Sequence, residues 1–373
     1  MVQNKLQPTE IARGILLLGV FHIHAMYAVL DHLGDPGAVR GAWLQIKLLA
    51  PHVVIFFALS GITSKSIADK TFVIVANRSL MLLLIAAFSH IIGILIQYAL
   101  WQEWISAYRF AKDIVKPIIY GTGYATFVAW FFVVLAIIRV FAFFFTWNLR
   151  YFVALTVIAT AGVAASIYLK LPDNLYEWRN WPAAFLMFLL GTRIAEGWRV
   201  PHWVGLPAVA AGLAGPVFNS PTLLTDGICI VCDPQFVAEP MVGGYGFMPL
   251  YFLGEFLFFF GLLWVSRLIA ATPIAGFLVY VGRRSIKLLL LHGWVILSIY
   301  GVAAYLPPTW RGVPLFLGIF AANTLLHVLL YEILNKPLDR FILACSITSR
   351  RLIAIAEGVI RFARPLPSRP HQP

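Results

Sequence analysis

The chain has 373 residues, of which 61% are apolar and only 12% are charged, and its mean hydropathy is +0.84. Soluble domains are about 45–50% apolar and about 25% charged, so this composition excludes an ordinary soluble enzyme, a disordered protein and a disulfide-rich scaffold. The formal net charge is +12. In a membrane protein such an excess is typical of cytoplasmic loops, so we expect a lipid bilayer as partner and no nucleic acid.

Apolar runs along the chain predict an all-α, polytopic integral membrane protein of about ten transmembrane helices. Crossing a bilayer takes roughly 20 apolar residues per helix. The predicted spans are 12–30, 49–64, 76–98, 119–145, 151–170, 182–197, 203–220, 248–269, 285–305 and 313–334. Residues 1–340 would form the transmembrane domain.

Positive charges predict that both termini lie in the cytoplasm. With the N-terminus inside, most of the 28 Lys and Arg residues fall on the inner side of the ten spans, as cytoplasmic loops require. Residues 341–373 interleave arginines with apolar residues. This pattern predicts a cytoplasmic, basic amphipathic helix on an anionic leaflet.

The three cysteines predict no metal centre. Cys229 and Cys232 share a polar loop, and Cys345 stands apart. A structural zinc site takes about four ligands, and nothing near the loop completes one. The loop pair is either a local disulfide or two inert thiols, and the sequence leaves both open.

Ionisable side chains inside apolar spans are candidates for function, because burying them in a bilayer costs free energy. They include six histidines, two acids and one arginine: His22, His24, His52, His90, His292, His327, Glu255, Glu332 and Arg13.

Helical geometry selects one of the two histidines in the first span. Residues advance about 100° and rise about 1.5 Å each. Arg13 and His24 therefore share a face about 16 Å apart along the axis, whereas His22 lies on the opposite face. The alternative is that Arg13 pairs with Glu10 at i,i+3 and His24 only bonds a neighbouring helix.

Further candidates lie in four short motifs. His52 precedes the run Phe56-Phe57-Ala58-Leu59-Ser60-Gly61, in which Ser60 and Gly61 are either helix-packing residues or ligand contacts. Arg78 opens the third span and Trp130 lies in the fourth. Gly282 can end a short helix and Ser285 can cap the next, which would place Arg283 and Arg284 at a helix N-terminus. There the two arginines would either bind an anion or only anchor the topology. His292 lies two turns beyond Ser285.

In this order the motifs resemble the membrane-bound acyltransferases of family 3, which O-acylate glycans and other acceptors. The resemblance rests on Arg13-x10-His24, the Phe-Phe-x-Leu-Ser-Gly run, Arg78, Trp130 and Gly282-Arg283-x-Ser285 with His292, and it extends from the first to the ninth span. The presence of His52 before the Ser-Gly run resembles the pattern of the branch that contains fucose O-acetylases. One departure is Met81, which stands where many members have a second arginine after Arg78.

The resemblance implies an O-acyltransferase of the bacterial inner membrane. Cytoplasmic acyl-CoA, most often acetyl-CoA, would be the co-substrate, with no tightly bound cofactor. Its phosphates would meet Arg13, Arg78, Arg283 and Arg284, and His24 would act as general base on an acceptor hydroxyl. His52, Ser60, Gly61, Trp130, Ser285 and His292 would line the substrate site. Polysaccharide-synthesis proteins are possible partners.

Three rival functions remain open from the sequence. A proton-coupled transporter or flippase would use intramembrane His and Glu as a proton relay, with Glu255 and Glu332 as its main support. A succinyl-type transferase of the same fold would add a negative charge to its acceptor. A structural partner in a polysaccharide-synthesis complex would tolerate loss of His24.

Overall fold

A computed structural model gives an all-helical protein, in which the described part of the chain contains no β-strand and only an isolated bridge between Glu239 and Gly244. It describes residues 3–363 except for 34, 65–66, 68–69, 102–105, 145–152, 154–156, 158–160, 162–174, 196–200, 228–235, 240–243 and 304–311. Outside the described residues lie the fifth predicted span (151–170) apart from residues 153, 157 and 161, both loop cysteines, Cys229 and Cys232, and the last ten residues of the predicted tail.

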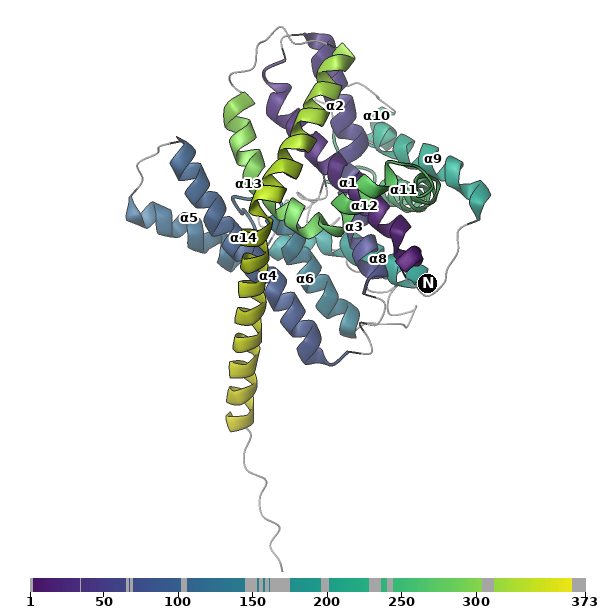
Figure 1. Ribbon diagram of the computed structural model, residues 1–373. Helices are drawn as coiled ribbons and strands as arrows, with labels where there is room; N and C mark the ends of the chain where they lie inside the picture. Colours follow the sequence, from purple (N-terminus) through teal and green to yellow (C-terminus); the bar gives the residue numbers. More distant parts are fainter. Residues whose placement is uncertain are drawn as a thin grey trace, which may run out of the picture.

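Figure 1 shows the helices coloured along the sequence. In chain order they are α1 (Gln3–Leu30), α2 (Pro36–Leu49), η1 (Ala50–Val54), α3 (Ile55–Ile62), α4 (Phe72–Trp101), α5 (Ala107–Tyr120), α6 (Ala129–Phe144), η2 (Leu175–Asn180), α8 (Trp181–Ala195), η3 (His202–Val204), α9 (Gly205–Phe218), α10 (Leu223–Asp226), α11 (Met248–Ile269), α12 (Ala275–Arg283), α13 (Ser285–Ala303) and α14 (Gly312–Ala363).

Five helical segments of the described chain are long and apolar enough to cross a membrane: Gln7–Leu30, Pro36–Ile62, Phe72–Leu100, Met248–Ile269 and Phe316–Gly358. Shorter apolar helices occur at Ala129–Phe144, Gly205–Phe218 and Ser285–Ile299. These helices confirm the all-α class and the membrane character expected from composition. By length and composition they give five candidate spans, not the predicted ten.

Two predicted boundaries are wrong. The second span does not begin at residue 49, because α3 alone rises only about 12 Å; α2, η1 and α3 together form one broken candidate span from Pro36. The fourth does not begin at residue 119. There α5 ends at Tyr120 and is capped by Gly121, whose φ of 66° is the left-handed conformation that glycine favours, and α6 starts only at Ala129. The eighth prediction, 248–269, matches α11.

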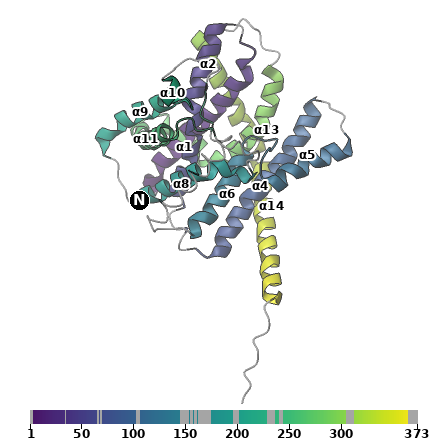
Figure 2. The same cartoon turned by 180° about the vertical axis from the view of Figure 1, so that it is seen from behind.

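Helix α1 lies at the centre of the bundle, as the two opposite views show (Figures 1 and 2). It packs against α2, α11, α12, α13 and α14. Its residue Phe21 is almost fully buried, together with Phe57, Phe132, Phe188 and Phe259 of other helices. A side chain on α1 is therefore placed to meet partners from distant parts of the chain.

Glycine allows α1 and α12 to approach each other closely. A Cβ atom on Gly14 would overlap the backbone of Leu278, and one on Gly282 would overlap the backbone of Glu10. Small residues at such crossings are a common way to pack helices in membranes. Gly282 thus permits close packing of α12 against α1, and α12 ends at Arg283, one residue beyond the helix end that the sequence suggested.

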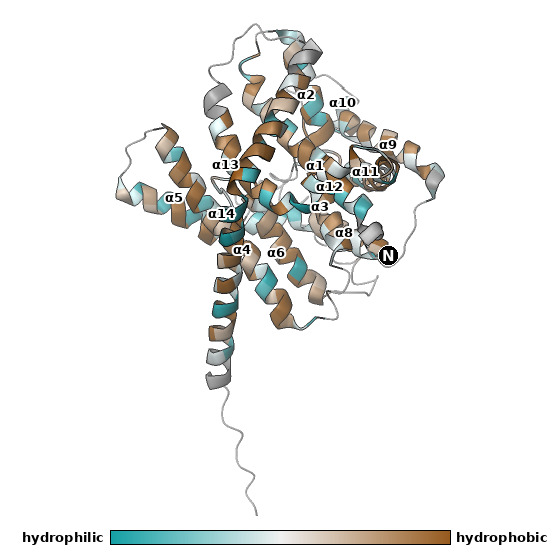
Figure 3. Ribbon diagram, in the orientation of Figure 1, coloured by the Kyte–Doolittle hydropathy of each residue, from teal (hydrophilic) through white to brown (hydrophobic). Residues whose placement is uncertain are grey.

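Helix α14 is the longest element, with 52 residues or roughly 78 Å. That length is more than twice the roughly 30 Å of a bilayer's hydrocarbon core. It continues without a break across residue 340, where the sequence divided the transmembrane domain from the tail. Its C-terminal half extends beyond the other helices (Figure 1) and alternates hydrophobic with hydrophilic residues (Figure 3).

Candidate active site

Three histidines from three helices form a hydrogen-bonded chain. His24 Nδ1 of α1 lies 2.6 Å from His292 Nε2 of α13. His292 Nδ1 lies 2.8 Å from His327 Nε2 of α14. His327 Nδ1 lies 2.7 Å from the carbonyl oxygen of Asn323, one turn earlier on the same helix. His292 and His327 are fully buried, and His24 is partly exposed.

The last carbonyl fixes the tautomers of all three neutral rings. A carbonyl oxygen only accepts, so His327 Nδ1 carries the hydrogen and its Nε2 accepts. His292 must then donate from Nδ1 and accept at Nε2, and His24 must donate from Nδ1. His24 Nε2 is left with a lone pair, and it has no hydrogen-bond partner among the described residues. The chain therefore presents one basic nitrogen at its partly exposed end.

Aromatic rings hold the histidine chain in place. Phe21 stacks on His327 with ring centroids 3.9 Å apart and planes at 19°, and it contacts His292 at 4.7 Å. The Asn323 amide donates to the Phe21 carbonyl oxygen at 2.7 Å. Phe127 stacks on the His24 ring at 5.7 Å and 21°. These contacts limit rotation of the rings, which a base of fixed direction requires.

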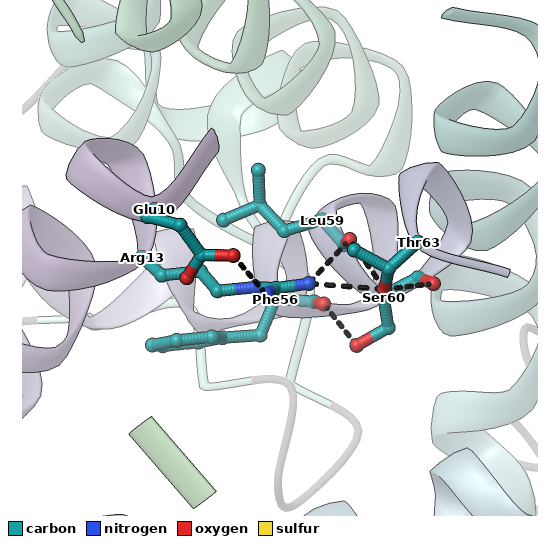
Figure 4. Close-up of polar contacts among 6 residues, drawn as sticks. All are labelled: Glu10, Arg13, Phe56, Leu59, Ser60 and Thr63. Atoms are coloured by element: carbon teal, nitrogen blue, oxygen red, sulfur yellow. Dashed lines mark hydrogen bonds and ion pairs between the residues drawn. The ribbon is translucent and has the colours of Figure 1, made fainter. Parts of the chain in front are cut away.

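Arg13 ties α1 to the C-terminal end of α3 (Figure 4). Its guanidinium donates to Glu10 Oε1 at 3.1 Å, to the Leu59 carbonyl oxygen at 2.9 Å and to Thr63 Oγ1 at 3.0 Å. A cation at the end of α3 also meets the negative end of the helix dipole. The Glu10 pair is the i,i+3 contact considered from the sequence, and Arg13 lies eleven residues from His24, about 16 Å along the axis.

The Ser60-Gly61 pair serves packing in this structure. Ser60 Oγ donates to the Phe56 carbonyl oxygen at 2.8 Å, within its own helix (Figure 4). A Cβ on Gly61 would overlap the Phe188 backbone of α8, so the glycine permits the close contact between α3 and α8. Trp130 is buried, with its ring edge against Phe57 at 6.0 Å.

His52 belongs to a separate buried pair. Its Nδ1 lies 3.0 and 3.2 Å from the two carboxyl oxygens of Glu255 on α11, and its ring stacks on Phe258 at 3.7 Å. Both His52 and Glu255 are at most 2% exposed. Glu332, the other intramembrane acid, instead accepts from the hydroxyl of Tyr280. Neither acid has a recorded contact with the three-histidine chain in the described part of the protein.

The other two intramembrane histidines have structural partners. His22 Nε2 lies 2.6 Å from Gln45 Oε1 of α2, whereas His24 contacts α13, so the two histidines lie on different faces of α1, as the helical spacing predicted. His90 donates from Nε2 to the Asp113 carbonyl oxygen at 3.0 Å and accepts at Nδ1 from the Ala125 amide at 2.9 Å. Both ring nitrogens of His90 are used, which ties α4 to α5 and to the following loop.

Arg78 has a second cation beside it. Arg139 of α6 lies close enough to Arg78 for their like charges to repel. No ion pair of either arginine is recorded within the described residues. Arg78 is exposed and Arg139 is partly exposed. Two uncompensated guanidinium groups at one end of α4 and α6 are suited to bind an anion such as a phosphate.

The motif at the start of α13 gives two arginines with different surroundings. Arg284 separates α12 from α13, and its guanidinium lies 4.0 Å from the Tyr280 ring centroid and 5.7 Å from that of Tyr331. Arg283 is exposed. Ser285 is the first residue of α13, which confirms the predicted helix start. Arg283 is therefore the one of the two whose guanidinium faces solvent.

Two features of the site were missed from the sequence. His327 was recognised only as an intramembrane histidine, and nothing in its spacing links it to His24. Arg139 was counted only as a positive charge on the inner side, although its place near the end of an apolar helix is a usable signal. Among the described residues, no group of three or more His, Cys, Asp or Glu side chains could hold a metal ion.

Comparison with known proteins gives no further guide, since no family model, no curated protein and no solved structure matches the chain.

Proposed function

We propose that this protein is an integral membrane O-acyltransferase that moves an acyl group, acetyl in the first instance, from cytoplasmic acyl-CoA to a hydroxyl of a glycan or similar acceptor. The observation that carries the proposal is the free lone pair on His24 Nε2, at the end of a histidine chain whose tautomers are fixed. A correctly oriented neutral imidazole is the commonest general base in enzymes. The resemblance of the sequence motifs supplies the reaction class.

The reaction balances with His24 as the group that carries the proton from the acceptor to the leaving thiolate. His24 Nε2 would take the proton of the acceptor hydroxyl while that oxygen attacks the thioester carbonyl carbon. The new C–O bond forms, the C–S bond breaks, and the departing thiolate of CoA takes the proton. The products are an O-acyl ester and free CoA.

The histidine chain would also stabilise the charge that His24 acquires. A proton bound at His24 Nε2 leaves every hydrogen bond of the chain in place, because His24 still donates from Nδ1. Two hops, from His24 to His292 and from His292 to His327, would move the positive charge to His327, beside the Asn323 carbonyl oxygen. His292 and His327 are in this proposal positioning residues and temporary proton holders.

The phosphates of the acyl-CoA donor would bind far from His24, near the other end of α1. Acyl-CoA carries its phosphates and its thioester at the two ends of a long arm, so residues far from His24 are suited to the phosphates. Arg78, Arg139 and Arg283 have no acidic partner in the described chain. Arg13 is already bonded to Glu10 and α3, so its first role would be to fix α1 against α3.

The proposal includes the topology expected from charge. The chain would lie in the inner membrane of a bacterium with both termini in the cytoplasm and about ten helices in the membrane. The shorter apolar helices α6, α9 and α13, with other segments, would then join the five candidate spans. Short or broken helices are tolerated where neighbouring protein covers them.

The test measures acetyl-CoA binding and slow hydrolysis by the purified protein in detergent, since water can replace an unknown acceptor. We expect His24→Ala to abolish hydrolysis while binding persists. His22→Ala is the matched control, because His22 lies on the same helix but bonds Gln45. Absence of acetyl-CoA binding at concentrations well above cellular levels would overturn the proposal.

A proton-coupled transporter is the second candidate, favoured by the buried His52–Glu255 pair. It predicts proton flux in proteoliposomes that is lost in Glu255→Gln and that is independent of acyl-CoA. The separation of this pair from the three-histidine chain favours the enzyme. A succinyl donor is distinguished by offering succinyl-CoA in the same hydrolysis assay.

A further inference from the structure

A cavity of about 820 Å³ opens between α4, α5 and the loop 121–128. Its lining includes Tyr98, Lys112, Lys116, Tyr124 and Phe127. Ligand sites commonly occupy 300–1,000 Å³, and the size here is sufficient for a short oligosaccharide segment. None of the residues singled out as donor-binding lies on its lining.

One wall of this cavity touches the candidate base. Phe127, which lines the cavity, stacks on the His24 ring. The loop that carries Phe127 is fixed, because Thr126 packs against Gly93 of α4 and Gly293 of α13, and a Cβ on either glycine would crowd it. The cavity and the His24 end of the histidine chain are thus held side by side.

The cavity is positively charged. Arg109, Lys112 and Lys116 follow one another at i, i+3 and i+7, so they share one face of α5. The acid on the lining, Asp113, already accepts from Tyr98 at 2.7 Å and lies 3.9 Å from Arg109. No ion pair of Lys112 or Lys116 is recorded in the described chain.

The apolar face of α5 turns away from the cavity. Tyr108, Val115 and Ile119 lie on that face and are between 48% and 78% exposed, as expected of a helix with this face toward lipid. Tyr98, Tyr120 and Tyr124 also line the cavity. Flat rings with hydroxyl groups suit a sugar, which offers apolar ring faces and many hydroxyls.

A strained turn follows Leu175, which lines the cavity. Tyr176 and Glu177 have φ of 49° and 58°, which non-glycine residues rarely adopt. Such strain is concentrated at functional sites. Glu177 accepts from Thr122 Oγ1, on the lining, at 2.8 Å.

We infer that this cavity is the acceptor site and that its acceptor is an anionic sugar, whose negative group lies against Lys112 and Lys116 and whose hydroxyl is presented to His24. The inference rests on the proposed function, which it deepens by naming the acceptor class. A carboxylate or a phosphate would provide the negative charge equally well, because lysine binds both as a compact cation.

The experiment measures binding by calorimetry to the full-length protein in nanodiscs. The probes are a hexuronate oligosaccharide, a sugar phosphate and a neutral glucose oligosaccharide of the same length. We expect at least one anionic probe to bind tenfold or more tightly than the neutral one, with affinity falling as salt rises. The double variant Lys112→Gln/Lys116→Gln should lose that preference, and Lys112→Arg/Lys116→Arg should keep it.

Lys336→Gln is the matched control, because Lys336 is exposed on α14 and far along the chain from this cavity. Equal binding of charged and neutral probes, or no binding at all, would overturn the inference. So would a double variant that loses affinity only for nanodiscs rich in phosphatidylglycerol, which would assign the lysines to lipid headgroups.

The hydrolysis assay separates this inference from the proposed function. Acetyl-CoA hydrolysis without anionic-sugar binding would overturn the acceptor site and leave the transferase intact. Anionic-sugar binding without acetyl-CoA binding would overturn the transferase, and with it the acceptor role of the cavity, and would leave a site for an anionic sugar. If both hold, the bound sugar should become acetylated, and the double variant should raise KM for the sugar with little change in kcat.

Discussion

His24 Nδ1 and His292 Nε2 lie 2.6 Å apart, although 268 residues separate them in the chain. Because His292 also donates to His327, the two nitrogens of His292 have fixed and opposite roles. This relationship orients His24 and leaves its Nε2 basic.

Loss of His292 should therefore slow turnover without weakening donor binding. We expect His292→Ala to lower kcat for acetyl-CoA hydrolysis by 10-fold or more, within the roughly 10²–10⁴-fold range of acid–base catalysis, with acetyl-CoA binding within twofold of wild type. Measurements of the hydrolysis rate and of acetyl-CoA binding on the same preparation check this. An equal effect of His22→Ala would show that the loss comes from packing alone.

Arg78 and Arg139 should act on the donor and not on chemistry. Glutamine at either position removes a cation suited to a phosphate, so KM for acetyl-CoA should rise several-fold with kcat nearly constant. Steady-state kinetics at two salt concentrations measure this, and the difference should shrink at high salt. Arg40→Gln, exposed on α2, is the control, and an unchanged KM in both variants would exclude this site.

Gly282→Ala should destabilise the protein by about 1–3 kcal/mol, the cost of overpacking, because the new methyl group would overlap the Glu10 backbone of α1. Thermal unfolding in detergent measures the change. Gly276→Ala is a matched control in the same helix, since nothing lies within 4 Å of the added atom. A Gly282→Ala protein as stable as Gly276→Ala would contradict the close α1–α12 contact.

Arg13→Ala should also lower stability, since it removes charged hydrogen bonds to the Leu59 carbonyl oxygen and to Glu10. Hydrogen bonds to charged groups contribute about 1.5–3 kcal/mol each. Arg283→Ala, which removes an exposed arginine, should change the unfolding temperature little. Equal unfolding temperatures for the two variants would argue against the link between α1 and α3.

Glu177 should make stability depend on pH. Burial raises the pKa of Glu177 to about 7, from 4.5 in an exposed carboxyl group. Between these values the folded state holds a proton that the unfolded state has lost, so stability falls as pH rises from about 4.5 to 7 and then levels off. At 1.36 kcal/mol per pKa unit, the loss is roughly 3 kcal/mol.

Glu177→Gln resembles the protonated form and should flatten this part of the pH profile. Unfolding temperatures at several pH values from 4.5 to 8 measure the slope. Asp226→Asn changes an exposed carboxylate and should leave the wild-type slope intact. A slope in Glu177→Gln as steep as in wild type would show that another group causes it.

The sequence was a good guide wherever a property depends on neighbours along the chain. Apolar runs indicated helices in a membrane, and the run 248–269 gave both ends of α11. Helical spacing gave the Arg13–Glu10 pair and the opposite directions of His22 and His24. Helix α5 was missed because its 14 residues are amphipathic, and a search for long apolar runs does not detect such a helix.

The sequence alone thus determined the helical class, the membrane character and the face on which His24 lies, because these properties depend on residues that are close together in the chain. Only the tertiary structure decided what His24 meets. The partners His292 and His327, the Arg139 beside Arg78 and the cavity behind Phe127 come from helices far apart in the chain. Their approach depends on close helix crossings such as that of Gly282 with α1. The spacing of residues along one helix does not predict these crossings.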